Sequence, residues 1–203
     1  MKRLLTLSEI EKNPKLLTYS LKLESEEKVT LRPLESKDLA KLKSFLKSVS
    51  KKTQKFYNLE SFDSKMAKKL CRDINKYDKL RFILEILPSK DIIALFEFSL
   101  DIPEGDKKRF LKYKIKLNNK DYCRFAPCIS DKYQNKKIGS LIFPKIIKIS
   151  KKIGRKKIIL WGGVLEKNIR AISFYKKNKF KELGKFKDPN IKDQKSLDMV
   201  RTI

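Results

Sequence analysis

Two apolar runs in the middle of the chain constrain its fold more than any other feature. Residues 80–87 ("LRFILEIL") and 91–100 ("DIIALFEFSL") are rich in Ile, Leu and Phe, and only "PSK" separates them. A connection of this length joins neighbouring antiparallel strands, because a parallel pair needs a crossover of a dozen or more residues. The centre of the sheet is therefore predicted to be antiparallel.

The remaining segments place helices on both sides of these strands. Apolar residues at helical spacing predict helices over 36–50, 64–77, 138–154 and 168–178, the first with Ser36 as its N-cap. Shorter β-like runs predict strands over 28–34, 121–130, 155–163, 180–186 and 196–203. Since β-α-β crossovers occur only late in the chain, we predict an α/β fold with a mixed, mostly antiparallel central sheet flanked by helices. Residues 101–120 are rich in Lys and fit neither pattern.

The length of 203 residues suits one well-buried domain. We expect a short N-terminal helical extension with a polar link over residues 1–27, and a single domain over residues 28–203. No apolar stretch approaches the roughly 20 residues of a membrane span, and the N-terminus lacks a signal-peptide pattern. We therefore expect a cytoplasmic monomer or homodimer with no membrane partner.

The formal net charge of +27 is high for a chain of this length. Of the 51 basic residues nine are Arg and 42 are Lys, and they are spread along the chain. Base recognition favours Arg, so this excess of Lys is weak evidence for sequence-specific nucleic-acid binding. Two explanations are open: a solvated Lys-rich surface, or a surface selected for an acidic partner. Non-specific attraction to RNA or anionic lipid is expected with either.

Several kinds of chemistry are excluded by what the sequence lacks. The chain has no His, which removes His-dependent nucleophilic catalysis and the commonest zinc sites. Cys71, Cys123 and Cys128 form no CxxC pair, so we expect neither a metal site nor a disulfide framework. Catalysis must come from carboxylates, Tyr, Lys, backbone amides or a cofactor.

The stretch "SDKYQNKKIGS" (130–140) connects a predicted strand to a predicted helix. The first turn of a helix presents unpaired N–H groups and the positive end of the helix dipole, which together favour a phosphate. Asn135, Lys136 and Lys137 add polar or cationic side chains. On spacing alone, an anion-binding turn and an ordinary polar loop are both compatible with this stretch.

Downstream residues favour the first alternative. The segments "YQNKKIGSLIF" (133–143) and "IILWGGVLEKNIRAISFYKKNKFKELG" (158–184) together resemble the GCN5-related N-acetyltransferase (GNAT) family. The acetyl-CoA signature of that family, Q/R-x-x-G-x-G/A, aligns with Gln134 to Gly139. A later family pattern is matched by Asn168, Ala171, Phe174, Tyr175 and Phe180. The resemblance covers roughly residues 28 to 203, and it implies acetyl-CoA as the acetyl donor and an acyl-CoA N-acyltransferase-like fold.

One departure from the signature concerns Lys137, which replaces its first glycine. A positive φ at this position would strain a Lys residue by about 1 kcal/mol. A helical conformation would cost nothing and would add a charge beside the phosphates. We expect the helical conformation.

The resemblance implies a role in cofactor binding for several residues. The end of the strand would pair with the pantetheine arm of acetyl-CoA through Cys128, Ile129 and Ser130. The pyrophosphate would lie against Gln134, Asn135, Lys136, Lys137, Ile138, Gly139 and Ser140. Asn168 would bond the pantetheine chain, or it is only a helix N-cap. Lys177 would approach the 3′-phosphate, or it is one more surface Lys.

The resemblance also implies that Tyr175 protonates the departing thiolate as general acid, unless it is only a core aromatic. A phenol with a pKa near 10 is protonated at neutral pH and suits that step. Glu97, an acidic residue within an apolar strand, is the first candidate for the general base, with an outward-facing structural residue as the alternative. Asp131 is the second candidate. Cys128, with no His to activate it, is expected to be a small core residue.

The sequence therefore predicts an N-acetyltransferase that moves acetyl from acetyl-CoA directly to a primary amine of a small molecule, peptide or protein, without metal. The helices within 36–77, the segment 101–120 and the loop 187–196 are expected to line the acceptor site. The alternative is a basic RNA- or ribosome-associated module that keeps the fold and lacks catalysis.

Overall fold

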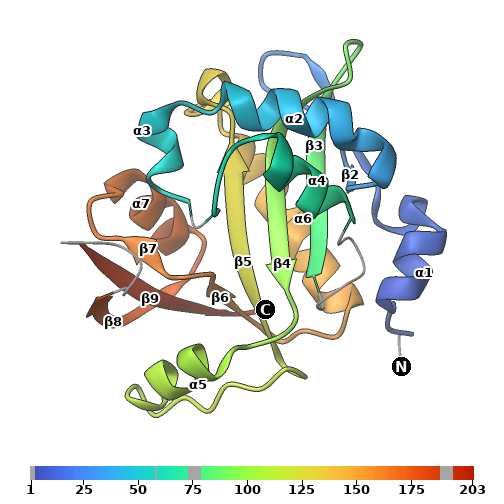
Figure 1. The fold of residues 1–203 in the computed structure, drawn as a ribbon. Coiled ribbons are helices and arrows are strands. Elements are labelled where there is room, and N and C mark those ends of the chain that lie inside the picture. The colour runs from blue at the N-terminus through green and yellow to red at the C-terminus, as the bar shows by residue number, and fades with distance from the viewer. Residues whose placement is uncertain (1–2, 58, 73–78, 188–193) are drawn as a thin grey trace.

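The computed structural model of the chain describes residues 3–57, 59–72, 79–187 and 194–203. Within these residues, nine strands form one sheet in the order β1-β2-β3-β4-β5-β6-β9-β7, with β8 also paired to β9 (Figure 1). The strands are Tyr19–Lys22 (β1), Lys28–Pro33 (β2), Lys79–Ile86 (β3), Asp91–Ser99 (β4), Tyr122–Ile129 (β5), Lys157–Leu160 (β6), Val164–Leu165 (β7), Lys181–Lys187 (β8) and Lys195–Thr202 (β9).

The described strands pair antiparallel except for β5 and β6, which are parallel. The tight connection between β3 and β4 gives the antiparallel pair that the two apolar runs predict. A mixed, mostly antiparallel sheet flanked by helices is thus confirmed.

Helices cover both faces of the sheet (Figure 1). They are Leu7–Lys12 (α1), Leu39–Ser48 (α2), Lys51–Gln54 (α3), Ser64–Arg72 (α4), Glu104–Leu111 (α5), Ile138–Lys152 (α6) and Ile169–Lys177 (α7). One apolar cluster joins α2 and α4 to Ile83 and Leu95. A larger cluster joins α1, α6 and α7 to Phe96 and Phe125 on the opposite face. Because β3 and β4 are covered on both faces, their sequences are apolar almost throughout instead of alternating.

Three boundaries differ from the sequence prediction. The polar link expected before residue 28 is wrong for Tyr19–Lys22, which form the edge strand β1 paired to β2. Its alternating half-buried pattern spans only four residues, too few to stand out in the sequence. Ser36 is not the helix cap: Glu35 and Asp38 cap a short 3₁₀ turn, and α2 begins at Leu39. The ambiguous segment 101–120 contains α5. The predicted helix over 64–77 is α4 as far as Arg72, and the rest of that prediction lies outside the described residues.

Candidate functional site

The two parallel strands β5 and β6 separate halfway along β5. Their last paired residues are Phe125 and Leu160, and the Trp161 N–H then donates to the Phe125 carbonyl at 3.0 Å. Beyond this point the chain turns away through Gly162 and Gly163, both with positive φ (71° and 69°). A Cβ on Gly163 would lie 2.7 Å from a backbone oxygen, so this turn needs glycine. The end of β5 is left with an open edge.

The open edge offers few main-chain hydrogen-bond donors. The Ser130 N–H points toward β4, donating to Ile93 at 2.9 Å, and N–H groups alternate along a strand. The N–H groups of residues 127 and 129 therefore face the open edge. Residue 127 is Pro and has no N–H, which agrees with the break in pairing expected at this position. Ile129 thus carries the main-chain donor of this edge.

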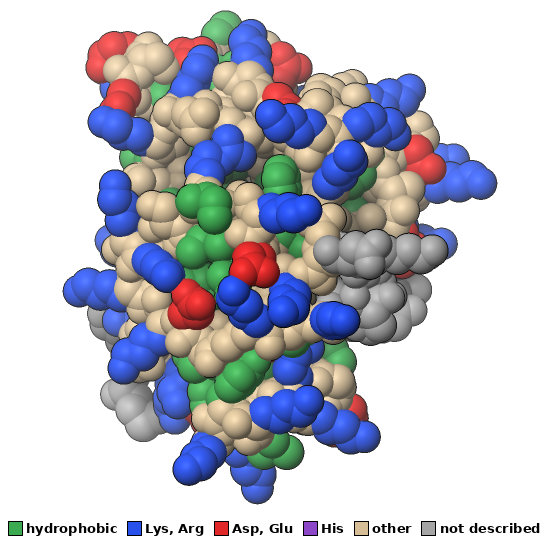
Figure 2. All heavy atoms as spheres, turned by 90° about the vertical axis from the view of Figure 1, so that its left-hand side faces the viewer, with side chains coloured by type: hydrophobic (Ala, Val, Ile, Leu, Met, Phe, Trp, Pro, Cys, Tyr) green, Lys and Arg blue, Asp and Glu red, His purple; other side chains and the backbone are tan. Residues whose placement is uncertain are grey.

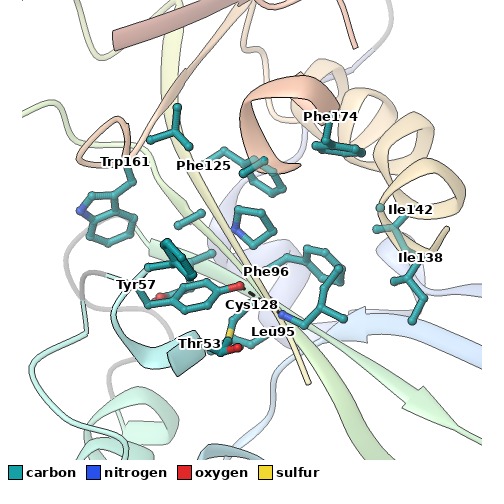
Figure 3. Close-up of a pocket in the computed structure, with 18 of the residues that line it drawn as sticks. Thr53, Tyr57, Leu95, Phe96, Phe125, Cys128, Ile138, Ile142, Trp161 and Phe174 are labelled. Atoms are coloured by element: carbon teal, nitrogen blue, oxygen red, sulfur yellow. Dashed lines mark hydrogen bonds between the residues drawn. The ribbon is translucent and has the colours of Figure 1, made fainter. Parts of the chain in front are cut away.

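The hydrogen-bond acceptor of this N–H group is Tyr57, a residue that the sequence did not single out. The Ile129 N–H donates to the Tyr57 hydroxyl at 3.3 Å. In Figure 3 the Tyr57 ring extends into the cavity with its hydroxyl close to Cys128. Burial raises the pKa of Tyr57 well above its ordinary value, with smaller effects from Cys128 and Tyr175. Tyr57 is therefore a neutral phenol at the end of β5.

A cavity of about 860 Å³ opens along this edge, between β4, β5, α6, α7 and the α3–α4 segment (Figure 3). It brings together most of the residues that the sequence selected. The selected residues that line it are Glu97, Cys128, Ile129, Gln134, Asn135, Lys137, Ile138, Gly139, Ser140, Asn168, Tyr175 and Lys177. Ser130, Asp131 and Lys136 are not part of its lining. The Lys136 ammonium instead lies over the Tyr133 ring, 5.1 Å from its centroid.

The turn before α6 has the geometry of an anion-binding site, but not the one expected for Lys137. Lys137 is the N-cap of α6 and adopts a left-handed conformation (φ 54°, ψ 15°), so the expected helical conformation is wrong. Asn135 is also left-handed, with φ 61°. The signature glycine thus corresponds to a position with positive φ, and Lys occupies it at a cost of about 1 kcal/mol.

Left-handed residues and a helix start together expose backbone donors. Among the described residues, no acceptor is found for the N–H groups of residues 135–140. These groups precede or open a helix of 15 residues, whose dipole is positive at this end. The Lys137 ammonium lies 2.9 Å from Glu24, and both side chains are mostly exposed. The turn can therefore accept a phosphate through its backbone, with a cation at its rim.

Gly139 is needed for helix packing and not for a special backbone angle. A Cβ at this position would lie 2.8 Å from the ring of Phe174 in α7. The absence of a side chain lets α7 approach the first turn of α6. This contact holds α7 against α6, and Tyr175, the next residue of α7, lines the cavity.

Arg170 is a further residue that the sequence did not identify. Its guanidinium donates to the Gln134 side-chain oxygen at 2.7 Å and contacts Asn135 at 3.5 Å. The Gln134 amide in turn donates to the Ile129 carbonyl at 3.0 Å and to Thr53 at 3.2 Å. Gln134 therefore ties the turn to β5, and Arg170 adds a cation that lines the cavity. Its position two residues after Asn168 was the only sequence signal.

Asp131 has a structural role that argues against its selection as a base. It accepts hydrogen bonds from the Ser50 N–H (2.8 Å), the Ser50 hydroxyl (2.7 Å) and the Thr53 hydroxyl (2.6 Å). Burial acts to raise its pKa, but these hydrogen bonds outweigh burial and hold the pKa below its ordinary value. Asp131 anchors α3, the helix that precedes Tyr57.

The Tyr175 side chain is buried in the aromatic cluster of α6 and α7, packed edge-on against Phe174 and Phe180. Burial raises the pKa of its phenol well above the ordinary value. No described residue hydrogen-bonds its hydroxyl, and the residue lines the cavity. Tyr175 is thus a neutral phenol with an available proton.

Glu97 lies in β4 opposite Arg81 of β3, and its carboxylate accepts from the Arg81 guanidinium at 2.7 Å. Both side chains are about nine-tenths buried (5% and 11% exposed). The structure therefore gives Glu97 an ion-pair partner and a place on the cavity wall, not an outward-facing position. Burial, and then Arg81, lower the pKa of the adjacent Lys79.

The other selected residues also have local roles. The Asn168 side chain accepts from the Ala171 N–H at 3.2 Å, which is the N-cap alternative, while the residue also lines the cavity. Cys128 is buried, and burial raises its pKa, so the structure supports a core residue and not a nucleophile.

No cluster of metal-ligand side chains occurs among the residues described. In the same part of the chain, no helix combines the length and apolar character that crossing a membrane requires.

Comparisons of the sequence gave no match to a protein-family model and none to a curated protein. The structure, in contrast, resembles solved acetyltransferases over most of its length. The GNAT domain of S. lividans PAT is 15% identical, with a TM-score of 0.70 over 94% of this chain and 99% of that one. The ribosomal-protein-S5-alanine acetyltransferase of Vibrio fischeri is 13% identical, with a TM-score of 0.67 over 91% and 96%.

A third structure was solved with the cofactor. The aminoglycoside acetyltransferase AAC(6')-Ib in complex with coenzyme A is 16% identical, with a TM-score of 0.65 over 86% of this chain and 94% of that one. Shared topology over whole chains accounts for these scores at such low identity. This chain therefore has the fold of the GNAT acetyltransferases.

Proposed function

We propose that the protein is an acetyl-CoA-dependent N-acetyltransferase that transfers acetyl directly to a primary amine. One observation carries this proposal: the open edge of β5, the N-terminal turn of α6 and the Tyr175 phenol face one cavity of about 860 Å³. These are the parts needed to bind an extended acyl carrier with a phosphate group and to protonate a leaving group.

The cavity suits acetyl-CoA from end to end. The N–H groups of residues 135–140 would hold the pyrophosphate, with Arg170 and Lys177 supplying positive charge. The pantetheine arm would lie along the open edge of β5, toward Ile129 and the carbonyl of Pro127. Asn168 keeps its amide nitrogen for this arm, since its oxygen caps α7. Solved neighbours that contain coenzyme A support this placement.

The chemistry can be assigned to two side chains. The neutral amine attacks the acetyl carbonyl carbon, and the tetrahedral intermediate collapses with cleavage of the C–S bond. Glu97, directly or through a water, takes the proton that the amine nitrogen loses. Tyr175 gives its phenolic proton to the departing sulfur and is reprotonated from solvent. No covalent enzyme intermediate is needed, which agrees with the inert environment of Cys128.

Tyr57 imposes a condition on binding. Its hydroxyl occupies the Ile129 N–H, the main-chain donor of the open edge. A cofactor carbonyl that uses this donor must displace the hydroxyl, so a hydrogen bond is exchanged and not simply gained.

The acceptor is a primary amine of a small molecule, peptide or protein. Solved neighbours include acetyltransferases named for spermidine, for aminoglycosides and for alanine of a ribosomal protein, which span this range. A basic module for RNA or the ribosome is the second candidate, favoured by the charge of +27 and by Lys137 in place of glycine. Binding alone does not require the buried Tyr175 phenol, whose hydroxyl has no hydrogen-bond partner among the described residues, whereas acetyl transfer uses its proton.

Transfer itself is tested by incubating the protein with acetyl-CoA and a panel of amines, and following release of the thiol and the mass of each amine. We expect an acetylated amine, formed much more slowly by Glu97→Gln, which retains a hydrogen-bond acceptor for Arg81. Equal rates for the two proteins would remove Glu97 from the mechanism. Release of thiol without an acetylated amine would contradict transfer.

A further inference from the structure

A second cavity of about 670 Å³ lies next to the first, between α5, β8 and the turn after β6. We call it the α5 groove. Its lining includes Asp106, Arg109, Arg124 and Trp161, together with exposed Lys residues. Nothing in the proposed chemistry uses this groove.

The α5 groove and the cofactor cavity share a wall. Trp161 lines both, while Arg124, whose guanidinium lies over the Trp161 ring, lines the α5 groove. The Arg124 guanidinium lies 4.3 Å from the Trp161 ring centroid, and the Lys79 ammonium lies 5.6 Å from it. A molecule that reaches Glu97 in the first cavity can therefore continue past Trp161 into the second.

The charge of the groove is unbalanced. Its cations are Lys108, Arg109, Lys112, Arg124, Lys185 and Lys187. The single carboxylate of its lining, Asp106, already pairs with Arg109 at 2.8 Å and with Arg124 at 3.5 Å. Asp198, fully buried, also pairs with Arg109 at 2.8 Å.

Three of the four exposed Lys residues of the groove lack such partners among the described residues. Lys185 pairs with Glu166, but Lys108, Lys112 and Lys187 have no carboxylate partner in the part of the chain that the structure describes. Figure 2 shows the same imbalance: Lys and Arg outnumber acidic side chains over this side, including its lower end, where α5 lies. The groove thus offers cations that an acidic ligand could pair with.

We propose that the acceptor is an amino group of an acidic polypeptide, whose carboxylates lie in the α5 groove while the amine reaches Glu97. This inference rests on the proposed acetyl transfer and names its substrate class. A nucleic acid would match the charge, but it has no aliphatic primary amine to present in the first cavity. A small amine would leave the α5 groove unused.

The test compares three synthetic peptides of one length and one N-terminal residue, which differ only in whether acidic, neutral polar or basic residues follow. With acetyl-CoA and the full-length protein, we expect the acidic peptide to have the highest kcat/KM, with an advantage that falls as salt is added. Equal kcat/KM for the three peptides would overturn the inference and leave acetyl transfer intact. Acetyl-CoA binding without transfer to any peptide would also overturn it. Absence of both binding and transfer would instead reject the proposed function.

A double variant, Lys108→Gln with Lys112→Gln, locates the effect. These exposed side chains are four residues apart, on α5 and at its C-cap, and neither lies in the cofactor cavity. We expect kcat/KM for the acidic peptide to fall roughly three- to tenfold, the effect of two exposed ion pairs, with little change for the neutral peptide. The matched control is Lys148→Gln with Lys151→Gln on α6, two exposed Lys residues outside both cavities, and we expect no change.

The nucleic-acid alternative is tested with the same variants. A short single-stranded RNA is titrated against each protein. If the α5 double variant lost RNA affinity while its kinetics with the acidic peptide stayed unchanged, the groove would be a nucleic-acid site and the inference would fail.

Discussion

Tyr57 and Tyr175 contribute neutral phenols to the same cavity, but their hydroxyls have different surroundings. The Tyr57 hydroxyl accepts from the Ile129 N–H, whereas no described residue hydrogen-bonds that of Tyr175. An available phenol can donate a proton, and an engaged one must first be displaced. The two residues therefore call for opposite predictions when each is changed to Phe.

For Tyr175→Phe we expect kcat to fall by about 10²–10⁴, the usual effect of removing a general acid. The dissociation constant of acetyl-CoA should hardly change, since the ring and its packing remain. Steady-state kinetics and calorimetry separate the two quantities. Tyr19→Phe, which changes a half-buried Tyr with a buried hydroxyl outside the cavity, is the control. Full activity in Tyr175→Phe would remove this residue from the mechanism.

For Tyr57→Phe we expect the free energy of unfolding without ligand to fall by about 1 kcal/mol, because one hydrogen bond is lost. Acetyl-CoA should bind about fivefold more tightly, since Ile129 is then free and the same 1 kcal/mol no longer opposes binding. Chemical denaturation and calorimetry measure the two effects. Weaker binding by Tyr57→Phe would mean that the hydroxyl contacts the cofactor and does not compete with it.

Lys137 separates the effect of backbone geometry from that of charge. Lys137→Gly removes both the left-handed strain and the cation, whereas Lys137→Gln removes only the cation. We expect only Lys137→Gly to stabilise the fold. Its free energy of unfolding should rise by up to about 1 kcal/mol, and its Tm should rise with it. Both variants should weaken acetyl-CoA binding by a similar factor of roughly two to five at low salt. A lower Tm for Lys137→Gly would contradict the strain that φ 54° implies.

The position of Lys137 also shows the limit of residue-level prediction. The signature spacing selected the turn before α6 as a candidate anion site, and the expected helical conformation of Lys137 was wrong. Backbone angles at a helix start depend on how the preceding strand and the turn are anchored. Here Gln134 and Asp131 fix the turn to Ile129, Ser50 and Thr53, contacts that no local pattern encodes.

At the scale of elements, sequence patterns succeeded where a segment is long and buried. The adjacent strands β3 and β4, the 15-residue helix α6 and the capped helix α7 follow from apolar content and capping residues. The short helix α3 was not predicted. It has four residues, and it is held by Asp131, which is 78 residues beyond Thr53. Since Tyr57 follows this helix, the local sequence gave no reason to select it.

The junction of β2, α2 and β3 depends on a buried ion network. Arg32 in β2 donates to both oxygens of Asp38 at 2.7 Å and to Glu85 in β3 at 2.8 Å. Burial acts to raise the pKa of Asp38, but the hydrogen bonds from Arg32 outweigh burial and lower it. A carboxyl with a lowered folded-state pKa stabilises the fold above its unfolded pKa, near 4, and loses this contribution as the pH falls through the folded value.

Asp38→Asn should therefore lower the free energy of unfolding at pH 7 by about 3 kcal/mol or more, because the Arg32 charge loses a buried partner. The difference from the wild type should shrink as the pH falls below about 4, and it should be lost once the pH passes the lowered folded-state pKa, below which the wild-type carboxyl is protonated too. Denaturant titrations of the wild type and the variant at pH 7 and below about pH 4 measure the difference in free energy of unfolding. Asp91→Asn, at an exposed strand end, should have no such effect. A difference that does not depend on pH would show that Asp38 acts through shape and not charge.

At the scale of the whole molecule, the sequence predicted the sheet type and selected twelve residues that line the cavity. It predicted that segment 101–120 and the loop 187–196 line the acceptor site, which is the use proposed for the α5 groove. It did not predict the groove itself, because 101–120 showed neither helical nor strand periodicity and because the groove also needs the turn after β6 and strand β8. Part of the loop expected to line the acceptor site, residues 188–193, lies outside the described residues. The charge of +27 alone could not distinguish a solvated surface from a binding surface. Lys108, Lys112 and Lys187, which line the α5 groove without a carboxylate partner among the described residues, favour the latter.

The most direct test of acetyl-CoA binding is a thermal melt at moderate salt with acetyl-CoA, with ATP at the same concentration, and with neither. At about 100 times its dissociation constant, a ligand stabilises the folded state by about 2.7 kcal/mol, which corresponds to several degrees for a domain of this size. We predict a clearly larger shift with acetyl-CoA than with ATP, since ATP can use the turn before α6 but not the open edge of β5. Equal shifts, or none, would mean that the turn is only a basic loop and that the cavity does not bind acetyl-CoA.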